Sequence, residues 1–447
     1  MTSCKKAVFY SEGSLDFSAD TVVFDTVFTT VGSTTQRLKI YNRSNRPLKV
    51  DQIELMGGEN SPFRINVDGL SGMVFGEQEI EANDSLWIFV EVTLDPNGGN
   101  LPLIIEDSIR FQNNGLNQYV VLAAWGQDAY FYNNELINSN TWTNDKPHVI
   151  YGAAVVDSAE TLTIEAGTDI YLHNNSLLYV YKGSLDIQGT KDFPVTLRGD
   201  RLEASYDDVP GQFYGIYFQE ALPSSINHCN IKNGIAGIHL FSEDPANTGY
   251  TLELNNSTVT NCSRYGLFMF QGAKVRAENC ILAKNNIHSF LVLGGGDFNL
   301  NHCHILNYGS GDSGGAVGIS NSYDNPNTLQ TEISDISEGV ITNSVIYGNA
   351  DFEFALDTLN PNQTFNFGFL FRNNLIKSDE QFTDNFFQNN IYNIDPLFIS
   401  VPDGDYKYPM NSPLHGSADE AWFPLSGTDI CNTLRITPVD IGAYELW

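Results

Sequence analysis

Between Ile226 and Ile305, apolar and polar residues alternate, and a short polar phrase interrupts the alternation four times. The phrase occupies residues 227–231, 255–259, 278–282 and 301–305. Its small third residue recurs after 28, 23 and 23 positions, from Cys229 to Ser257, Cys280 and Cys303. A repeat of this length without a helical period predicts a β-helix, in which each repeat is one coil. Successive coils then stack at the ordinary strand spacing of about 4.8 Å.

Stacking in register turns equivalent positions into columns. Cys229, Ser257, Cys280 and Cys303 are expected to form an inward column with no room for larger side chains, and the Asn and His residues beside them are expected to mark a bend. The neighbouring strand-like runs predict an outward column. If Ile216, Ile238, Leu267 and Phe290 face inward, an apolar column faces outward, formed by Tyr217, His239, Phe268 and Leu291, with Phe270 extending it.

This outward column is the predicted partner-binding surface, because an apolar ladder on an acidic solenoid is typical of a docking face or a sugar-stacking platform. The alternative is that loops fold over it. A gap of 41 residues between Cys303 and Ser344 predicts an inserted loop around 309–338, which is one such cover.

Residues 15–130 show a different pattern, with short alternating runs about every ten residues and turn clusters at 42–47 and 95–99. These features predict a β-sandwich. The stretch Tyr41-Asn42-Arg43-Ser44, followed by Pro47-Leu48, by Ser61-Pro62-Phe63 and by Asp84-Ser85-Leu86-Trp87, resembles Ig-like domains of the abnormal-spindle/hydin kind. The resemblance implies a binding or spacing module without catalytic residues.

From Trp142 onwards the chain resembles right-handed parallel β-helix proteins of the pectin-lyase-like class. The resemblance rests on residues 161–168, 185–189, 194–197 and 210–216, and it implies a β-helix over 131–395. Residues 396–447 are similar to the choice-of-anchor caps of bacterial β-helices, through 395–398, 411–414 and 440–445, so we expect them to cover the last open coil. The expected fold is therefore all-β, an Ig-like β-sandwich followed by a right-handed parallel β-helix solenoid.

The formal net charge of −31 disfavours binding to nucleic acid, whose phosphates require Lys and Arg. It also disfavours polyanionic glycans. Three of the six cysteines fall at one repeat position, which indicates buried free thiols rather than a disulfide framework. No stretch is apolar enough to span a membrane.

The domain order resembles exported lipoproteins of Bacteroidota. Thr2-Ser3-Cys4 resembles the end of a lipobox, either in a trimmed chain or by chance, and six Asp-[Ser/Thr]-apolar triplets resemble the O-glycosylation sequon of that phylum. The resemblance implies a tether at 1–14 with a lipid on Cys4. It also implies an outer-membrane location, at the cell surface or on the periplasmic face, with outer-membrane proteins as partners.

Several stretches are candidates for catalytic or metal sites. Gly311-Asp312-Ser313-Gly314-Gly315 copies a serine-protease nucleophile loop, but no matching histidine motif precedes it, so we interpret it as a chance match. Lys274, Arg276 and Glu278 share one outer face and are the best local group for a polysaccharide lyase, with a solvated strand face as the plainer interpretation.

Three places are candidates for metal binding. Acidic loops at Asp200, Glu203, Asp207 and Asp208, and at Asp403 and Asp405, carry the oxygen ligands that Ca²⁺ prefers, without a known calcium-loop spacing. His302 and His304 point the same way on one strand, but too few further ligands lie beside them, so we interpret them as turn histidines. We therefore expect no catalytic residue, no metal site and no cofactor, with Ca²⁺ left open.

Taken together, the sequence predicts a non-enzymatic, lipid-anchored scaffold at the outer membrane. It would be an accessory subunit of an insertion, secretion or uptake assembly, with Tyr217, His239, Phe268, Phe270 and Leu291 as its binding face. The alternative from another class is a β-helix that binds, cleaves or eliminates a polysaccharide.

Overall fold

The computed structural model describes residues 14–28, 33, 35–94, 103–243, 249–309, 314–380, 382, 384–424 and 426–446. The chain divides into two compact units, residues 1–129 and 130–447. The short helices in the described part are 3-10 turns at Gly58–Asn60, Ala204–Tyr206, Pro361–Gln363 and Glu420–Trp422. None of the described helices has the length and apolarity that crossing a membrane requires.

The first unit is built from two five-stranded sheets around one apolar core. One sheet has the order β1 (Asp16–Phe17), β3 (Gln36–Tyr41), β10 (Ser85–Val92), β6 (Phe63–Val67), β7 (Leu70–Gly72). The other has the order β2 (Thr21–Phe28), β12 (Leu116–Gln127), β11 (Leu103–Asn113), β5 (Gln52–Leu55), β8 (Val74–Phe75). A further pair joins β4 (Leu48–Val50) to β9 (Gln78–Ile80). Alternate residues of β10 are buried, as expected for a strand with one face on the core.

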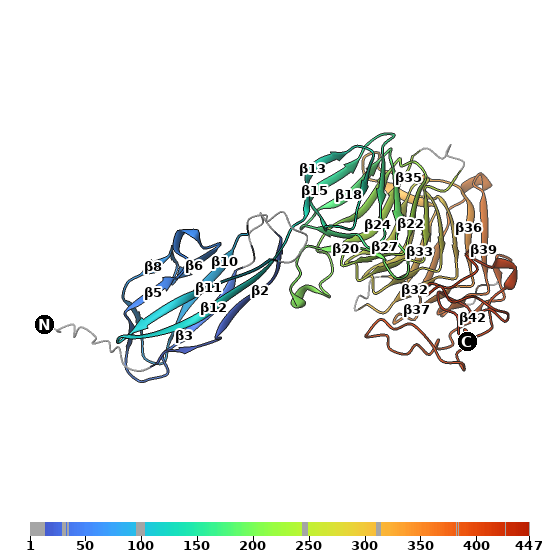
Figure 1. The fold of residues 1–447 in the computed structure, drawn as a ribbon. Coiled ribbons are helices and arrows are strands. Elements are labelled where there is room, and N and C mark those ends of the chain that lie inside the picture. Colours follow the sequence, from blue (N-terminus) through green and yellow to red (C-terminus); the bar gives the residue numbers. More distant parts are fainter. Residues whose placement is uncertain are drawn as a thin grey trace. The chain divides into compact units, whose positions relative to one another are not determined.

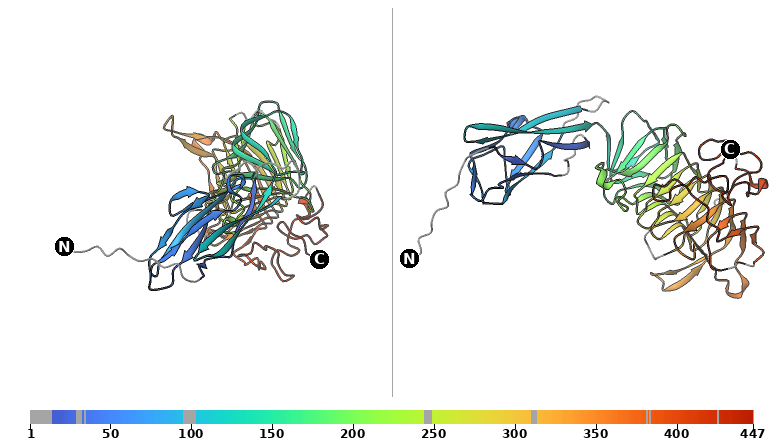
Figure 2. Two further views of the ribbon diagram at one scale, coloured as in Figure 1. Left: turned by 60° about the vertical axis from the view of Figure 1, so that its left-hand side comes forward. Right: turned by 90° about the horizontal axis from the view of Figure 1, so that it is seen from below.

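The second unit is a parallel β-helix, as predicted, and Figures 1 and 2 show its strands in parallel stacks. Each complete coil contributes one strand to each of three faces, and along the chain the first face is followed by the second and the second by the third. The first face consists of β18 (Leu177–Tyr181), β21 (Gly215–Gln219), β24 (Ala236–Phe241), β27 (Tyr265–Phe270), β30 (His288–Leu293), β33 (Val317–Ser320) and β38 (Phe354–Asp357).

The second face is a ten-stranded sheet of β14 (Asn140–Trp142), β16 (Thr161–Ile164), β19 (Ser184–Gln188), β22 (Ser224–Asn227), β25 (Leu252–Asn255), β28 (Lys274–Glu278), β31 (Asp297–Asn301), β36 (Ile336–Thr342), β39 (Phe367–Arg372) and β41 (Phe387–Gln388). The third face consists of β17 (Asp169–Leu172), β20 (Val195–Gly199), β23 (Cys229–Lys232), β26 (Thr258–Thr260), β29 (Ile281–Ala283), β32 (His304–Asn307), β37 (Val345–Gly348), β40 (Leu375–Ile376) and β42 (Ile391–Tyr392). The longer strands β13 (Tyr130–Ile137) and β15 (His148–Val156) open the stack.

The inward cysteine column is confirmed. Cys229, Cys280 and Cys303 are fully buried and not disulfide-bonded, and each precedes or opens a strand of the third face in the same register. Ser257 completes the column and links the coils, since its hydroxyl accepts a hydrogen bond from the Cys229 amide at 3.0 Å. Ser344 does the same for the Cys303 amide at 2.9 Å, one coil further on.

The bend between the second and third faces is one residue in the left-handed region, which Asn tolerates better than most residues. The bend residues are His228, Asn256, Asn279, His302, Asn343, Asn373 and Asn389. Their side chains reach along the stack: the Asn279 amide donates to Oδ1 of Asn256 at 3.2 Å. The Asn and His residues therefore mark the bend, as the sequence analysis expected.

The segment after residue 395 differs from the expectation. Instead of lying over the last open coil, it packs along the outside of the third face, where Tyr406, Tyr408 and Leu414 join a core with Leu306 and Val345. The physical reason is that outward positions of this face are themselves apolar and need cover. The aromatic residues that pack on the open end of the core are instead Phe382, Phe386, Phe387 and Tyr392.

The same segment is fastened to the bend residues. Asn343 accepts a hydrogen bond from the Asp419 amide at 2.7 Å and donates one to the Asp419 carbonyl at 3.2 Å. Arg435, buried with Glu445, donates to Oδ1 of Asn279 at 2.9 Å. The bend residues thus both form the turn between two faces and hold the segment after residue 395 by hydrogen bonds.

The inserted loop is shorter than predicted. Within 309–338, β33 and β36 are regular coil strands, and the insertion is a hairpin of β34 (Ser322–Asn325) and β35 (Gln330–Ile333) between the first and second faces. The length of the gap could not distinguish a long loop from a complete coil that carries a short hairpin.

The cysteine column supplies a stability prediction. Cys280→Leu adds volume where Sγ already lies 3.3 Å from the Leu254 carbonyl oxygen, so we expect the free energy of unfolding to fall by about 1–3 kcal/mol in urea titrations. Cys431→Leu is the control, because Cys431 is only half-buried and outside the column. It should cost less than about 1 kcal/mol. Equal losses for the two variants would contradict a tightly packed column.

Candidate functional site

The outward side of the first face carries two parallel ladders of side chains. The inner neighbours Ile216, Ile238, Leu267 and Phe290 are fully buried. The first ladder consists of Tyr179, Tyr217, His239, Phe268 and Leu291, paired in register from strand to strand. The second ladder lies two residues further along each strand and consists of Tyr181, Gln219, Phe241, Phe270, Leu293, Ser320 and Asp357.

Four members of the first ladder form a continuous stack of rings. Ring centroids lie 5.3 Å apart for Tyr179 and Tyr217, 4.7 Å for Tyr217 and His239, and 4.5 Å for His239 and Phe268. The Tyr214 hydroxyl lies 2.7 Å from Nδ1 of His239. Burial lowers the pKa of His239 to about 4, so near pH 7 it is a neutral ring within the stack.

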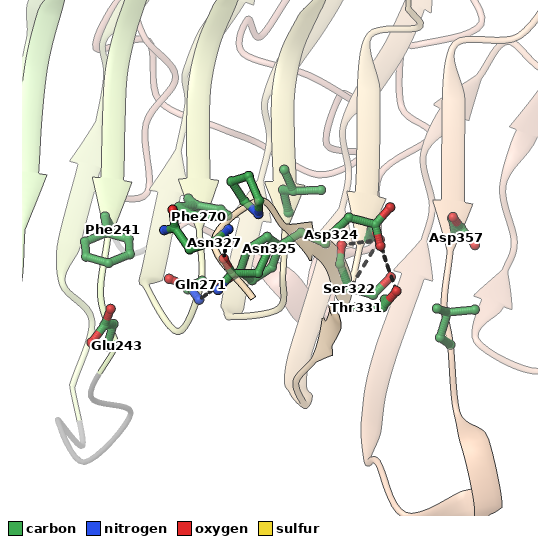
Figure 3. A pocket seen from close by; sticks show the side chains of 15 residues that line it. Phe241, Glu243, Phe270, Gln271, Ser322, Asp324, Asn325, Asn327, Thr331 and Asp357 are labelled. Atoms are coloured by element: carbon green, nitrogen blue, oxygen red, sulfur yellow. Dashed lines mark hydrogen bonds between the residues drawn. The ribbon is translucent and has the colours of Figure 1, made fainter. Parts of the chain in front are cut away.

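The second ladder lines an open groove of ≈ 850 Å³. Figure 3 shows Phe241 and Phe270 side by side on adjacent strands, with centroids 5.7 Å apart. The hairpin forms the opposite side, where the Tyr323 ring meets Phe270 edge-on at 4.9 Å. An adjoining hollow of ≈ 720 Å³ shares Phe241 and continues along the ladder to Tyr181. We call these two connected hollows the ladder groove.

Hydrogen bonds hold the hairpin wall in place. The Tyr323 hydroxyl donates to Oε2 of Glu332 at 2.6 Å and accepts from Nε2 of Gln271 at 2.5 Å. Desolvation and the Glu332 carboxylate raise the pKa of Tyr323 to about 12, so its hydroxyl keeps its proton. The hairpin therefore forms a fixed side of the ladder groove and packs on Phe270 of the second ladder through the Tyr323 ring.

The polar lining of the ladder groove is acidic and amide-rich. Glu243, Asp324 and Asp357 are exposed at its rim, as Figure 3 shows, together with the amides of Gln271, Asn325 and Asn327. The adjoining hollow adds Glu220 and Lys182. Such a lining offers hydrogen bonds to hydroxyl groups and repels anions.

The five predicted binding residues fall on two different ladders. Phe270 lines the ladder groove, whereas Tyr217, His239, Phe268 and Leu291 belong to the half-buried first ladder beside it. Phe241 and Tyr181 were not among the predicted binding residues, although strand alternation places them on the same outward side, two residues beyond the first ladder. Tyr323 was not among them either, because it comes from the insertion and so carries no repeat position.

The proposed lyase group lies elsewhere. Lys274, Arg276 and Glu278 do share an outer face, but on β28 of the second face. Lys274 also lines a small hollow with Glu220 and Leu222 at the edge of the ladder groove. Lys274 forms an ion pair with Asp297 at 3.3 Å, and Arg276 one with Glu253 at 3.4 Å. Their charges are thus matched by acids of neighbouring coils.

The acidic loop at 200–208 does not converge on one point. His173 contacts Asp200 at 2.7 Å, and Lys232 forms an ion pair with Asp208 at 2.8 Å. Arg201 and Arg198 contact Glu203 at 3.0 Å and Asp207 at 3.9 Å. Asp403 and Asp405 take part in turn hydrogen bonds with Ser400. Over the described ranges, no group of three or more His, Cys, Asp or Glu residues is arranged to hold a metal ion.

His302 is a bend residue and His304 opens β32, both fully buried beneath the C-terminal segment. Nε2 of His302 lies 3.2 Å from the Asn343 amide nitrogen, and neither ring nitrogen of His304 has a hydrogen-bond partner. Cys4 and residues 311–313 of the protease-like pentapeptide lie outside the described residues.

A family model described as a right-handed β-helix region matches residues 167–305, which is less than half of the chain. No curated protein matches the chain.

Two similar solved structures are a family 123 glycoside hydrolase from Clostridium perfringens and an ASH/PapD-like domain of human CEP192. The hydrolase is 10% identical with a TM-score of 0.19, and the match covers 27% of this chain and 30% of the hydrolase. The human domain is 10% identical with a TM-score of 0.18, covering 29% of this chain and 94% of that domain. Neither similarity carries an argument about function.

The buried histidine yields a pH prediction. Burial, with a smaller contribution from Arg435, lowers the pKa of His304 to about 3, against 6.5 for an ordinary histidine. Between these values the unfolded chain binds a proton that the folded chain excludes, so stability is full above pH 6.5 and falls on acidification. From pH 6.5 to 4.5 the native protein should lose about 2–3 kcal/mol more than His304→Phe, measured by urea unfolding.

Phe398→Leu is the control, because Phe398 packs on the His304 ring at 5.3 Å without titrating. It should lower stability at every pH and keep the native slope. A His304→Phe protein with the native slope would contradict the assignment.

Proposed function

We propose that the β-helix binds a linear, uncharged polysaccharide along the ladder groove and does not cleave it. The observation that carries this proposal is the set of aromatic side chains in the second ladder, Tyr181, Phe241 and Phe270, bordered by Tyr323 from the hairpin. Gln219 lies between Tyr181 and Phe241. Aromatic rings offer flat apolar surfaces to the faces of sugar rings, and the surrounding amides and carboxylates accept and donate hydrogen bonds to their hydroxyls.

The dimensions support an extended ligand. The second ladder spans seven strands, from β18 to β38, and six steps at about 4.8 Å give a length of about 29 Å. Among the described residues, the hairpin lines the groove and the two hollows share Phe241 and Glu243. A chain of several sugar units parallel to the helix axis fits this shape better than a small enclosed ligand does.

Charge selects the class of polysaccharide. Glu220, Glu243, Asp324 and Asp357 line the ladder groove against Lys182. A uronic-acid or sulfated polymer would place its negative charges against these carboxylates, at a cost of several kcal/mol in total. The ligand is therefore a neutral polymer.

The positions of the basic side chains support binding without eliminative cleavage. An eliminating enzyme needs a Lys or Arg base beside its substrate, and the candidates Lys274 and Arg276 are ion-paired on another face. The predicted scaffold role at an outer membrane, with a lipid on Cys4, stays a prediction. A surface that favours a protein partner lies on the sandwich unit and is considered below.

The test is a screen of neutral and anionic polysaccharides against the full chain, followed by calorimetry on the best ligand. We expect a neutral linear polymer to bind, and Phe241→Ala and Phe270→Ala each to weaken it roughly tenfold, since each removes one stacking surface. Phe193→Ala removes an aromatic side chain that is 64% exposed outside the groove, and it should leave affinity unchanged.

Preferential binding of polyuronates, or equal affinity in all three variants, would refute a ladder-groove site for neutral glycans. Release of oligosaccharides from the bound polymer would show an enzyme instead of a binding protein. The binding assay and the oligosaccharide-release assay use the same purified protein. Circular dichroism of each variant beforehand shows whether it is folded.

A further inference from the structure

The outward face of one sandwich sheet combines aromatic rings with positive charge. On β3, β10 and β6 the inward residues are fully or almost fully buried, among them Leu38, Ile88 and Ile65. The alternate positions point outward on the three central strands of that sheet. We call them the basic aromatic face, which consists of Arg37, Lys39, Tyr41, Arg64, Asn66, Trp87 and Phe89.

The centre of this face is an ordered aromatic pair. Trp87 and Phe89 lie nearly parallel with centroids 6.1 Å apart, and Trp87 remains 36% exposed. The Lys39 ammonium lies 3.8 Å from the centre of the Trp87 ring. Cross-strand pairing sets this arrangement, because Trp87 is opposite Lys39 and Phe89 is opposite Arg37. The rings are thus held in place before any partner arrives.

The charge of this face is opposite to that of the chain. Asp and Glu outnumber Lys and Arg by 54 to 23 overall, yet Arg37, Lys39 and Arg64 surround the aromatic pair. Two carboxylates lie on the same side. Glu91 is opposite Arg64 and accepts a hydrogen bond from Thr35 at 2.6 Å. Asp16 is opposite Tyr41 and forms an ion pair with Arg43. A concentration of positive charge around exposed rings on an acidic protein is complementary to an acidic partner.

The shape favours a protein over a small ligand. Sites for small molecules are concave, whereas protein interfaces are built on flatter surfaces around Trp, Tyr and Arg side chains. We propose that the basic aromatic face binds an acidic polypeptide surface. Carboxylates of the partner would pair with Arg37, Lys39 and Arg64, and an apolar or aromatic side chain would pack on Trp87. This site is independent of the ladder groove.

The experiment measures binding of the full chain to poly-L-glutamate and to a random copolymer of Glu and Tyr, by fluorescence anisotropy of labelled polymer at several salt concentrations. We expect both polymers to bind, the copolymer more tightly, with affinity that falls as salt rises. The double variant Arg37→Glu, Lys39→Glu should weaken both at least tenfold. Trp87→Ala should remove the preference for the copolymer.

A variant with the same change in net charge is the control. Lys49→Glu with Lys191→Glu reverses two exposed or partly exposed cations away from this face and should keep native affinity. If both double variants lost polymer affinity equally, net charge alone would explain the loss, and the proposal would be overturned. Tighter binding to phosphatidylglycerol vesicles than to either polymer would also overturn it, by showing a lipid-binding surface.

Discussion

Parallel hydrogen bonding between successive coils is the constraint on which the β-helix depends. Each strand pairs with the strand one coil away, so each residue lies between the residues at the same repeat position of the coils above and below. This repetition gives equivalent repeat positions similar environments. Small thiols and hydroxyls share one buried column, Asn and His share one bend, and aromatic rings share an outer ladder. A groove along the axis is a direct consequence, because a ladder has length but no closed end.

The same constraint creates surfaces that a single coil cannot satisfy. The third face has apolar residues on its outward side as well, at Ile281, Leu306 and Val345. This outward side needs a covering layer, which the segment after residue 395 supplies. Trp142, Tyr132 and His148 stack at the first coils, while Phe382 and Phe387 pack at the last. The solenoid thus closes its core with aromatic side chains at both ends and covers one side with the C-terminal segment. The first face, by contrast, keeps its outer ladders only half-covered.

Much of the β-helix could be predicted from the sequence, because the same residue types recur at the same position of each repeat. The step from Cys280 to Cys303 and the alternation in β27 are sufficient to place the core, the bend and the first ladder. Features outside the repeat could not be inferred. Tyr323 reaches Phe270 from a hairpin whose position depends on tertiary contacts, and the C-terminal segment follows the bend column through Asp419 and Arg435. Ion pairs such as Lys274 with Asp297 need the register between coils, which a single strand does not reveal.

Disulfide trapping of neighbouring coils tests the in-register stack most directly. Phe241 and Phe270 are register partners, so their Cα atoms are about 5 Å apart, a separation that a disulfide can bridge. Gln219 and Phe270 are two coils apart, at a Cα separation of about 10 Å, which is too long for a disulfide. After mild oxidation, peptide mass spectrometry should find the cross-link in the Phe241→Cys, Phe270→Cys protein. It should be absent from the Gln219→Cys, Phe270→Cys protein. A cross-link in the second protein but not in the first would contradict the stacking register and, with it, the ladder groove.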